Sequence, residues 1–395
     1  MSIGSTITDI FSLSNAKIND VTIDVNNKRL SGINDVTIDV NNKRLSGWTR
    51  VSIRRGIEIM PSTFELECTE PSDTHSALPE GADCVIRIGG QAVITGYILT
   101  VTRRLSASEH ILSVQGTSKT TDLCECSAKF QTYQFNNIPV IELIKAICKP
   151  YGIGVKTIGA VDNIVIPKFS VILTETGYEI IDRMTRAAAL LFYDDTDGNI
   201  IVSKVGSETA ASGFVEGKNV EEASVRRSLS GRFSAVTMIL QTTSPLAAMP
   251  GEDTQISQQM NDLTVGKDAI DPMVKRYRPL LISAEMGDAG YIVSQQRAQW
   301  EVNRRFGRSQ SVQIITDSWR DQSGKLWTPN TLAPISLPIL KVNTTNKLLI
   351  SETVFRLGND GTHAEITLMP AEAFMPQPIV LNAANSGVVQ AMAEG

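Results

Sequence analysis

Residues 84–98 read CVIRIGGQAVITGYI, and this stretch decides the fold class. Two runs of alternating apolar residues flank Gly89-Gly90, and glycine accepts the positive φ angles that a two-residue turn between antiparallel strands requires. The stretch therefore predicts a β-hairpin. Similar short strands separated by turn residues precede and follow it, so residues 36–118 are predicted to form a small antiparallel barrel or sandwich.

Residues 119–205 differ, because helical periodicity appears among the strands. Pro139 falls in the first turn of a predicted helix, where its missing N–H costs nothing. Thr176 and Glu179 have the spacing of a capping box at the start of a second helix. A hairpin with its turn at 194–199 is predicted to follow. We therefore expect a mixed α/β domain here.

The remainder of the chain returns to strands. Residues 206–224 are small and polar, which predicts a linker or crossover. Residues 225–370 predict a second barrel-like domain containing a helix over 288–306 that buries Trp300. Residues 371–395 have little periodicity and predict an arm that needs a partner to become ordered. The predicted fold class is α+β, with two antiparallel β-barrel-like domains flanking a smaller mixed α/β domain.

A perfect duplication lies near the start of the chain. Residues 18–32 and residues 33–47 both read INDVTIDVNNKRLSG, and each copy contains an alternating strand followed by a polar turn. Only one copy can occupy a given place in a sheet. We expect the copy that adjoins Trp48 to be integrated and the first copy, within an N-terminal extension over 1–35, to be peripheral.

Composition excludes several classes of protein. With 42% hydrophobic and 20% charged residues, the 395-residue chain is not largely disordered, and it can fill more than one core. No apolar run is long enough to span a bilayer, and no secretory signal is visible. A net charge of −5 argues against nucleic-acid affinity driven by overall basicity. Five cysteines without framework spacing predict reduced thiols in a protein made in a cytoplasm.

Motifs for chemistry are missing from the sequence. The three histidines fall in loops or turns, without a nucleophile motif beside them. A calcium loop counted from Asp195 has Ile200 where glycine is needed and Gly206 where glutamate is needed. Paired arginines such as Arg54-Arg55 point to opposite faces of a strand and form no single patch. We therefore predict no catalytic, cofactor-binding or metal-ligating residue, and no enzyme.

An ordered set of segments over residues 36–375 resembles the phage Mu-type baseplate hub protein of contractile tails. The matching stretches include GWTRVSI (47–53), VITGYI (93–98), GTSKTTDL (116–123), ETGYEIIDR (175–183) and GKLWTPN (324–330). The resemblance singles out Trp48, Gly96, Tyr97, Asp122, Tyr178, Glu179, Arg183, Trp300, Trp319, Trp327 and Asn330 as structural residues.

The resemblance implies a homotrimer in the virion tail baseplate, made in the host bacterial cytoplasm. Each subunit would supply two barrel-like tube domains, so that three subunits match the sixfold tail tube above and the threefold central spike below. The implied partners are a second and third copy, the tail tube protein, the central spike protein and other baseplate proteins. Genome DNA would pass only in transit, and neither a cofactor nor a membrane is implied.

Two other functions stay open on the sequence. One is the equivalent hub of a phage-derived bacteriocin or secretion system, which a single chain cannot separate from a phage hub. The other is a tail enzyme that degrades the cell envelope, which would need a cleft holding a perturbed carboxylate or a metal.

Overall fold

We describe the fold from a computed structural model. The described residues are 23–25, 28–30, 36–69, 78–130, 132–161, 163–206, 208–240, 264–265, 268–284, 290–343 and 347–376.

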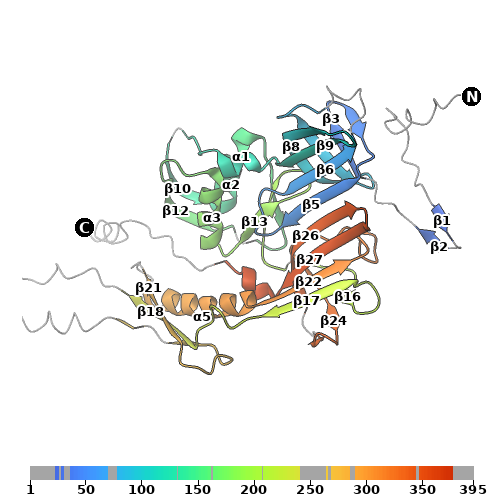
Figure 1. The fold of residues 1–395 in the computed structure, drawn as a ribbon. Helices are drawn as coiled ribbons and strands as arrows, with labels where there is room; N and C mark the ends of the chain where they lie inside the picture. The colour runs from blue at the N-terminus through green and yellow to red at the C-terminus, as the bar shows by residue number, and fades with distance from the viewer. Residues whose placement is uncertain are drawn as a thin grey trace, which may run out of the picture.

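One large, mainly antiparallel sheet dominates the molecule (Figure 1). Its main path is β17-β22-β27-β26-β5-β6-β9-β8-β7-β3-β4, and β15 and β23 attach beside β26. The bounds along the path are β17 (Glu222–Arg227), β22 (Gln310–Thr316), β27 (Gly361–Met369), β26 (Leu348–Gly358), β5 (Arg50–Gly56), β6 (Thr63–Thr69), β9 (His110–Ser118), β8 (Gln91–Leu105), β7 (Asp83–Ile88), β3 (Val36–Val40) and β4 (Lys43–Leu45), with β15 (Glu208–Thr209) and β23 (Thr331–Ala333).

This continuity corrects the expectation of two separate closed barrels. The strands of 36–118 do not close on themselves, because β5 pairs antiparallel with β26, from Glu352 opposite Gly56 to Leu357 opposite Val51. Both strand-rich blocks also share one hydrophobic core, in which Ile53 and Trp319 are fully buried. The antiparallel, mostly β character is as predicted, but the sheet is open rather than barrel-closed.

The hairpin at 84–98 is confirmed. β7 and β8 pair antiparallel with Ile88 opposite Gln91, and Gly89 and Gly90 have φ angles of 55° and 79°. Those angles belong to a turn with positive φ at both central positions, which matches the twist of the flanking strands.

The mixed α/β unit has its own core beside the large sheet. Its elements are α1 (Thr121–Glu125), β10 (Gln134–Pro139), α2 (Val140–Cys148), η1 (Lys149–Tyr151), β11 (Val155–Ile158), β12 (Val165–Ser170), α3 (Gly177–Ala187), β13 (Leu191–Asp194) and β14 (Ile200–Ser203). The capping box of α3 and the β13–β14 hairpin are confirmed. Pro139 is the N-cap of α2 rather than a first-turn residue, because the helix begins one residue later.

The stretch predicted as a linker, 206–224, is partly built into sheets. β15 pairs parallel with β23, and β16 (Phe214–Val215) pairs parallel with β24 (Ile335–Leu337), which continues to β25 (Val342–Asn343). Phe214 is fully buried against Trp327, with ring centroids 4.5 Å apart. The sequence did not predict this pairing, because strands of two residues are too short to show an alternating apolar pattern.

Helix α5 (Gly290–Arg308) lies beside a small sheet of β18 (Ala235–Leu240), β19 (Thr264–Val265), β20 (Ala269–Ile270) and β21 (Pro279–Ala284). The predicted helix is therefore present, two residues shifted at each end. Trp300 is half-buried rather than buried, and its indole Nε1 donates to the Met375 carbonyl at 2.7 Å.

The start of the predicted C-terminal arm is docked within the subunit. The short helix η2 (Ala371–Phe374) packs on α5, and Ala373 and Phe374 are buried. A Cβ added to Gly307 would meet the Ala373 backbone nitrogen at 2.4 Å, so a glycine permits this approach. Residues 371–376 thus need no partner to be ordered, and 377–395 lie outside the described residues.

The prediction for the duplication is confirmed. The second copy supplies β3 and β4, and β3 pairs with β7 of the large sheet. The first copy supplies β1 (Ile23–Val25) and β2 (Lys28–Leu30), which pair only with each other among the described strands and lie apart from the body in Figure 1. The identical sequence gives the same hairpin register in both copies.

Candidate assembly surface

Eight strands of the large sheet form a strip made of two four-strand motifs, which we call the eight-strand strip. The first motif is β5-β6-β9-β8 and the second is β17-β22-β27-β26. Numbered along the chain, the strands of each motif lie in the order one-two-four-three. Figure 1 shows the second motif continuing the sheet below the first. The two blocks recognised separately in the sequence thus share one topology.

One face of the strip is buried on the core and the opposite face is polar. Along β5 the burial alternates, with Val51, Ile53 and Arg55 buried and Arg50 and Arg54 exposed. Such alternation is the expected result of a period of two on a sheet with one solvated face. The prediction that adjacent arginines point opposite ways therefore holds for this pair.

A hollow of about 620 Å³ lies on the polar face, across β17, β22, β27, β26, β5 and β6. Its charged lining consists of Glu65, Glu67, Glu221, Glu222, Asp360 and Glu365, with Arg50, Arg356 and His363. Six carboxylates therefore face two guanidinium groups and one imidazole, and the hollow is acidic overall.

In this hollow, both ring nitrogens of His363 contact acceptor oxygens. Burial opposes its charged form, but the Asp360 carbonyl at 3.0 Å from Nε2 and the Glu221 carboxylate at 2.7 Å from Nδ1 favour it more. The pKa of His363 is therefore raised above its usual value. His363 lies in β27 rather than in the turn predicted for it, and its imidazole contacts the Asp360 carbonyl of the preceding turn and the Glu221 carboxylate beside β17.

The two motifs meet where β5 pairs with β26, which we call the β5–β26 seam. This seam has an ion pair on its exposed face and a buried arginine on the other. Arg54 Nε lies 2.5 Å from Glu352 Oε1 across the β5–β26 seam. Arg55, on the opposite face, is only 7% exposed. Burial lowers the pKa of Arg55, while the nearby Asp194 and Asp195 carboxylates act in the opposite direction.

Asp194 joins the strip to the mixed α/β unit. Its carboxylate is buried and accepts from the Ser62 backbone N–H and hydroxyl, both at 2.8 Å, and from the hydroxyls of Ser118 and Thr120. Several donors on one carboxylate stabilise a buried charge that would otherwise be costly. Sequence reasoning missed this residue, because its donors lie 74 to 132 residues away along the chain.

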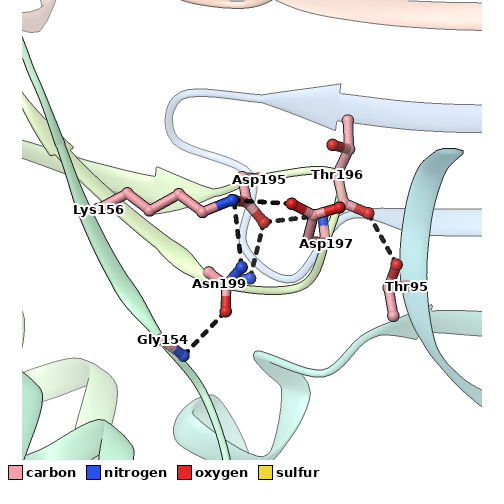
Figure 2. A network of polar contacts seen from close by, with 7 residues as sticks. All are labelled: Thr95, Gly154, Lys156, Asp195, Thr196, Asp197 and Asn199. Atoms are coloured by element: carbon pink, nitrogen blue, oxygen red, sulfur yellow. Dashed lines mark hydrogen bonds and ion pairs between the residues drawn. The ribbon is translucent and has the colours of Figure 1, made fainter. Parts of the chain in front are cut away.

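The turn after Asp194 makes a second connection, shown in Figure 2. Lys156 Nζ lies 2.6 Å from Asp195 and 2.8 Å from Asp197, while Asp195 Oδ1 also accepts from two backbone N–H groups of the turn. The Thr196 carbonyl accepts from Thr95 Oγ1 of β8 at 2.9 Å. The carboxylates that suggested a calcium loop are thus engaged by a lysine and by the turn itself.

Three of the residues singled out by resemblance lie in the first motif or directly before it. Trp48 is buried just before β5, and Tyr97 is partly buried, which raises the pKa of its phenol. A Cβ on Gly96 would lie 1.8 Å from the Thr117 carbonyl, so β8 and β9 approach too closely there for any side chain.

Four more lie in the mixed unit. Glu179 closes the capping box of α3, and Tyr178 packs against Phe192 with ring centroids 5.1 Å apart. Arg183 bonds Glu175 at 2.7 Å and lies 4.5 Å from the centre of a phenylalanine ring. Burial, with a smaller contribution from Glu125, raises the pKa of Asp122 in α1.

The remaining four lie in the last block. Trp319 is fully buried and donates to the His363 carbonyl at 2.9 Å, and Trp327 donates to Ser318. Asn330 has a φ of 62° and accepts from the Gly206 N–H at 2.7 Å. Together with half-buried Trp300, these residues pack, cap and connect elements. The eleven residues are spread over all three blocks of the chain rather than gathered in one cleft.

Among the described residues, no group of three histidine, cysteine or acidic side chains is placed to hold a metal ion. What the surface offers is a broad polar sheet face and strand edges, which are features that associate with other chains.

Comparison with known proteins identifies the class. Residues 35–118 match the N-terminal domain of the Mu phage baseplate assembly protein GpP-like family, 120–204 match the second domain of baseplate hub protein gp44-like proteins, and 291–377 match the fourth domain of GpP. The baseplate hub protein gp44 of Escherichia phage Mu is 30% identical over 331 residues, which are 83% of this chain and 86% of that protein.

Solved structures agree with these matches. The 43 kDa tail protein of prophage MuSo2 from Shewanella oneidensis is 28% identical, with a TM-score of 0.74 over 87% of this chain and 100% of its own. A tail protein of Neisseria meningitidis MC58, 20% identical, shares the fold with a TM-score of 0.70 over 87% and 98%.

Fold and relatives together define a structural protein of phage tails. Within that class, the chain belongs to the Mu-type baseplate hub family. No helix in the described part of the chain has the length and apolar character needed to cross a membrane.

Proposed function

We propose that three copies of this chain form a ring that joins the tail tube to the central spike, with a lumen through which genome DNA passes. The observation that carries this proposal is the repeat of one four-strand motif within the eight-strand strip. A chain with two like motifs presents six in a trimer, so that the same ring can match a sixfold and a threefold partner.

The polar face suits the lumen of such a ring. The opposite face of the sheet is buried on the core, so the hollowed face is free to point inward. Its excess of carboxylates would repel the phosphates of passing DNA and prevent adhesion. The tail tube protein, the central spike protein and other baseplate proteins would contact the two ends of the ring.

Light scattering on the purified protein, alone and mixed with its cognate spike protein, tests this proposal. We expect a species of three times the 43.0 kDa chain mass in at least one condition. Averaged electron micrographs of that species should show a hollow ring with threefold symmetry. A strict monomer in both conditions would overturn the proposal.

A further inference from the structure

A cleft of about 430 Å³ lies between the mixed α/β unit and helix α5, and we call it the α3–α5 cleft. One wall comes from α3 and the start of β13, and the other comes from α5, η2 and the residue that follows Met375. Figure 1 shows α3 and α5 on the two sides of this cleft. Clefts of this size with apolar and aromatic linings are typical binding sites.

Large apolar side chains on both walls of the cleft retain exposed surface. Tyr178 and Leu191 on one wall are only half-buried, and so is Trp300 on the other. Phe192 and Phe374 lie beside them in the lining. An apolar occupant would remove this surface from water, which favours its binding.

The charged groups of the cleft pair with one another. Arg186 bonds the Asp182 carboxylate within α3. Arg304 Nη2 of α5 lies 3.6 Å from Glu58 Oε1. These two acidic and two basic side chains are the charged lining of the cleft, so it has no net charge. Such a cleft suits an uncharged segment better than a charged one.

Two donors of α5 hold the chain at this cleft. Trp300 Nε1 donates to the Met375 carbonyl at 2.7 Å, and Arg304 Nη1 donates to the same oxygen at 3.5 Å. Met375 has a φ of −58° and a ψ of 125°, near the polyproline II conformation. The next residue, Pro376, lines the cleft. The described part of the chain therefore ends within the lining of the cleft.

The sequence that continues from Pro376 has the character that the cleft requires. Residues 377–381 read QPIVL, and Glu394 is the only charged residue in 377–395. Pro378 fixes its own φ and favours an extended conformation at Gln377. In an extended chain, residues 379–381 come roughly 9–16 Å after Pro376.

We propose that the α3–α5 cleft is a peptide-binding groove whose occupant is residues 377–381 of the same chain, with the aliphatic side chains of 379–381 against the aromatic lining. This contact continues the docking of residues 371–376 on α5. A short covalent link gives the segment a high effective concentration at the groove. The bound segment contacts both walls, so it ties the mixed α/β unit to α5. It does so within one subunit, independently of the proposed ring.

Trp300 provides the first test, because the other three tryptophans of the chain are buried. In the full-length chain, the test variant replaces three residues with serine: Ile379, Val380 and Leu381. The matched control makes the same replacement further along the same tail, at Val388, Val389 and Met392. Acrylamide quenching and the emission maximum of tryptophan fluorescence are measured for both and for wild type.

We expect stronger quenching and a red-shifted emission for the test variant, and wild-type values for the control. The difference should disappear when both variants also carry Trp300→Phe, because Trp300 is its source. Wild-type fluorescence in the test variant, or equal changes in the test and control variants, would overturn the proposal.

Disulfide trapping supplies a second test and identifies the chain that provides the segment. In a Cys126→Ser background, Arg186→Cys in the cleft is combined with Val380→Cys. The matched control combines Val380→Cys with Lys145→Cys, an exposed position on α2 outside the cleft. Both proteins are oxidised at low concentration, and the linked peptides are identified by mass spectrometry after digestion.

We expect a disulfide within one chain for the first pair and free thiols in the control. Disulfides only between chains, seen as covalent dimers on a non-reducing gel, would mean that a second copy supplies the segment, and they would overturn the same-chain contact. Free thiols in both proteins, or equal crosslinking in both, would overturn the groove itself.

Discussion

The two four-strand motifs of the strip share their strand order, but the first strand of one is covered and that of the other is open. β5 pairs with a strand on each edge, β6 and β26, whereas β17 pairs only with β22 among the described strands. The strand registers align Arg55 of β5 with Arg227 of β17. Arg55 is buried close to Asp194 and Asp195 of the mixed α/β unit, whereas Arg227 is exposed. Nearly identical segments therefore differ in burial because their neighbours in the fold differ.

The largest expected effect comes from truncation to alanine at two equivalent positions, Ile53 in β5 and Val225 in β17. Ile53→Ala removes a fully buried side chain and should cost about 2–5 kcal/mol of unfolding free energy. Val225→Ala, at the half-buried equivalent, should cost about 1 kcal/mol or less in the monomer. Denaturant unfolding followed by circular dichroism measures both, and equal losses would break the comparison.

A glycine present in one motif only gives the next effect. Gly96→Ala should destabilise the protein by about 1–3 kcal/mol, because the new methyl group would collide with the Thr117 carbonyl of β9. When β8 and β26 are aligned on their register shifts, after Ile98 and after Ile350, the position that matches Gly96 is Leu348, where the strands leave room for a side chain. Leu348→Ala, which adds no atoms, is the control for a clash. A Gly96→Ala protein as stable as wild type would show that β8 and β9 separate freely.

A smaller effect concerns pH and the second motif alone. Because the pKa of His363 is raised, its protonated contacts stabilise the fold below the usual pKa near 6.5, and this stability is lost as pH rises through the raised value. Melting temperatures of wild type and His363→Gln should differ most below about pH 6.5 and converge as the pH rises above the raised pKa of His363. The first motif has Ile111 at the aligned position and should contribute no such dependence. A difference in melting temperature that increases with pH would contradict the raised pKa of His363.

The smallest effect is expected for the duplication. Removing residues 18–32 or 33–47 gives the same polypeptide, because the copies are identical. That protein retains one hairpin to pair with β7, so its stability should match wild type within about 0.5 kcal/mol. A clear loss of stability in thermal unfolding would mean that the first copy also supports the sheet.

Local features of the fold could be predicted from the sequence because local chemistry causes them. Gly89-Gly90 marked a turn, and Thr176 with Glu179 marked a helix start. The β5–β26 seam could not be predicted, since its residues lie about 300 positions apart and alternation does not name a neighbour. Trp300 was expected inside because of its face on α5, but its neighbour is the backbone of a segment beyond the last strand.

For the candidate surface too, local features could be predicted from the sequence and long-range contacts could not. The sequence indicated which residues belong to the family pattern, and most of them turned out to pack or cap their own elements. The buried Asp194 was missed, because a lone aspartate before a turn is ordinary until its distant hydroxyl donors are known. The sequence shows the arginine pairs Arg54-Arg55 and Arg226-Arg227, but only the strand registers show that the two pairs occupy equivalent positions in the two motifs.

The bulge that recurs in β8 and β26 also bears on how many copies an assembly would contain. A bulge bends its strand and increases the local twist, and here one bend is repeated every four strands. When subunits associate through two different, complementary surfaces, each added subunit leaves one surface free for the next. Such an assembly ends only when the last subunit contacts the first and closes a ring. The curvature that each subunit adds to the sheet would therefore determine how many subunits close the ring. A variant that flattens either bend would change this number or leave an open spiral.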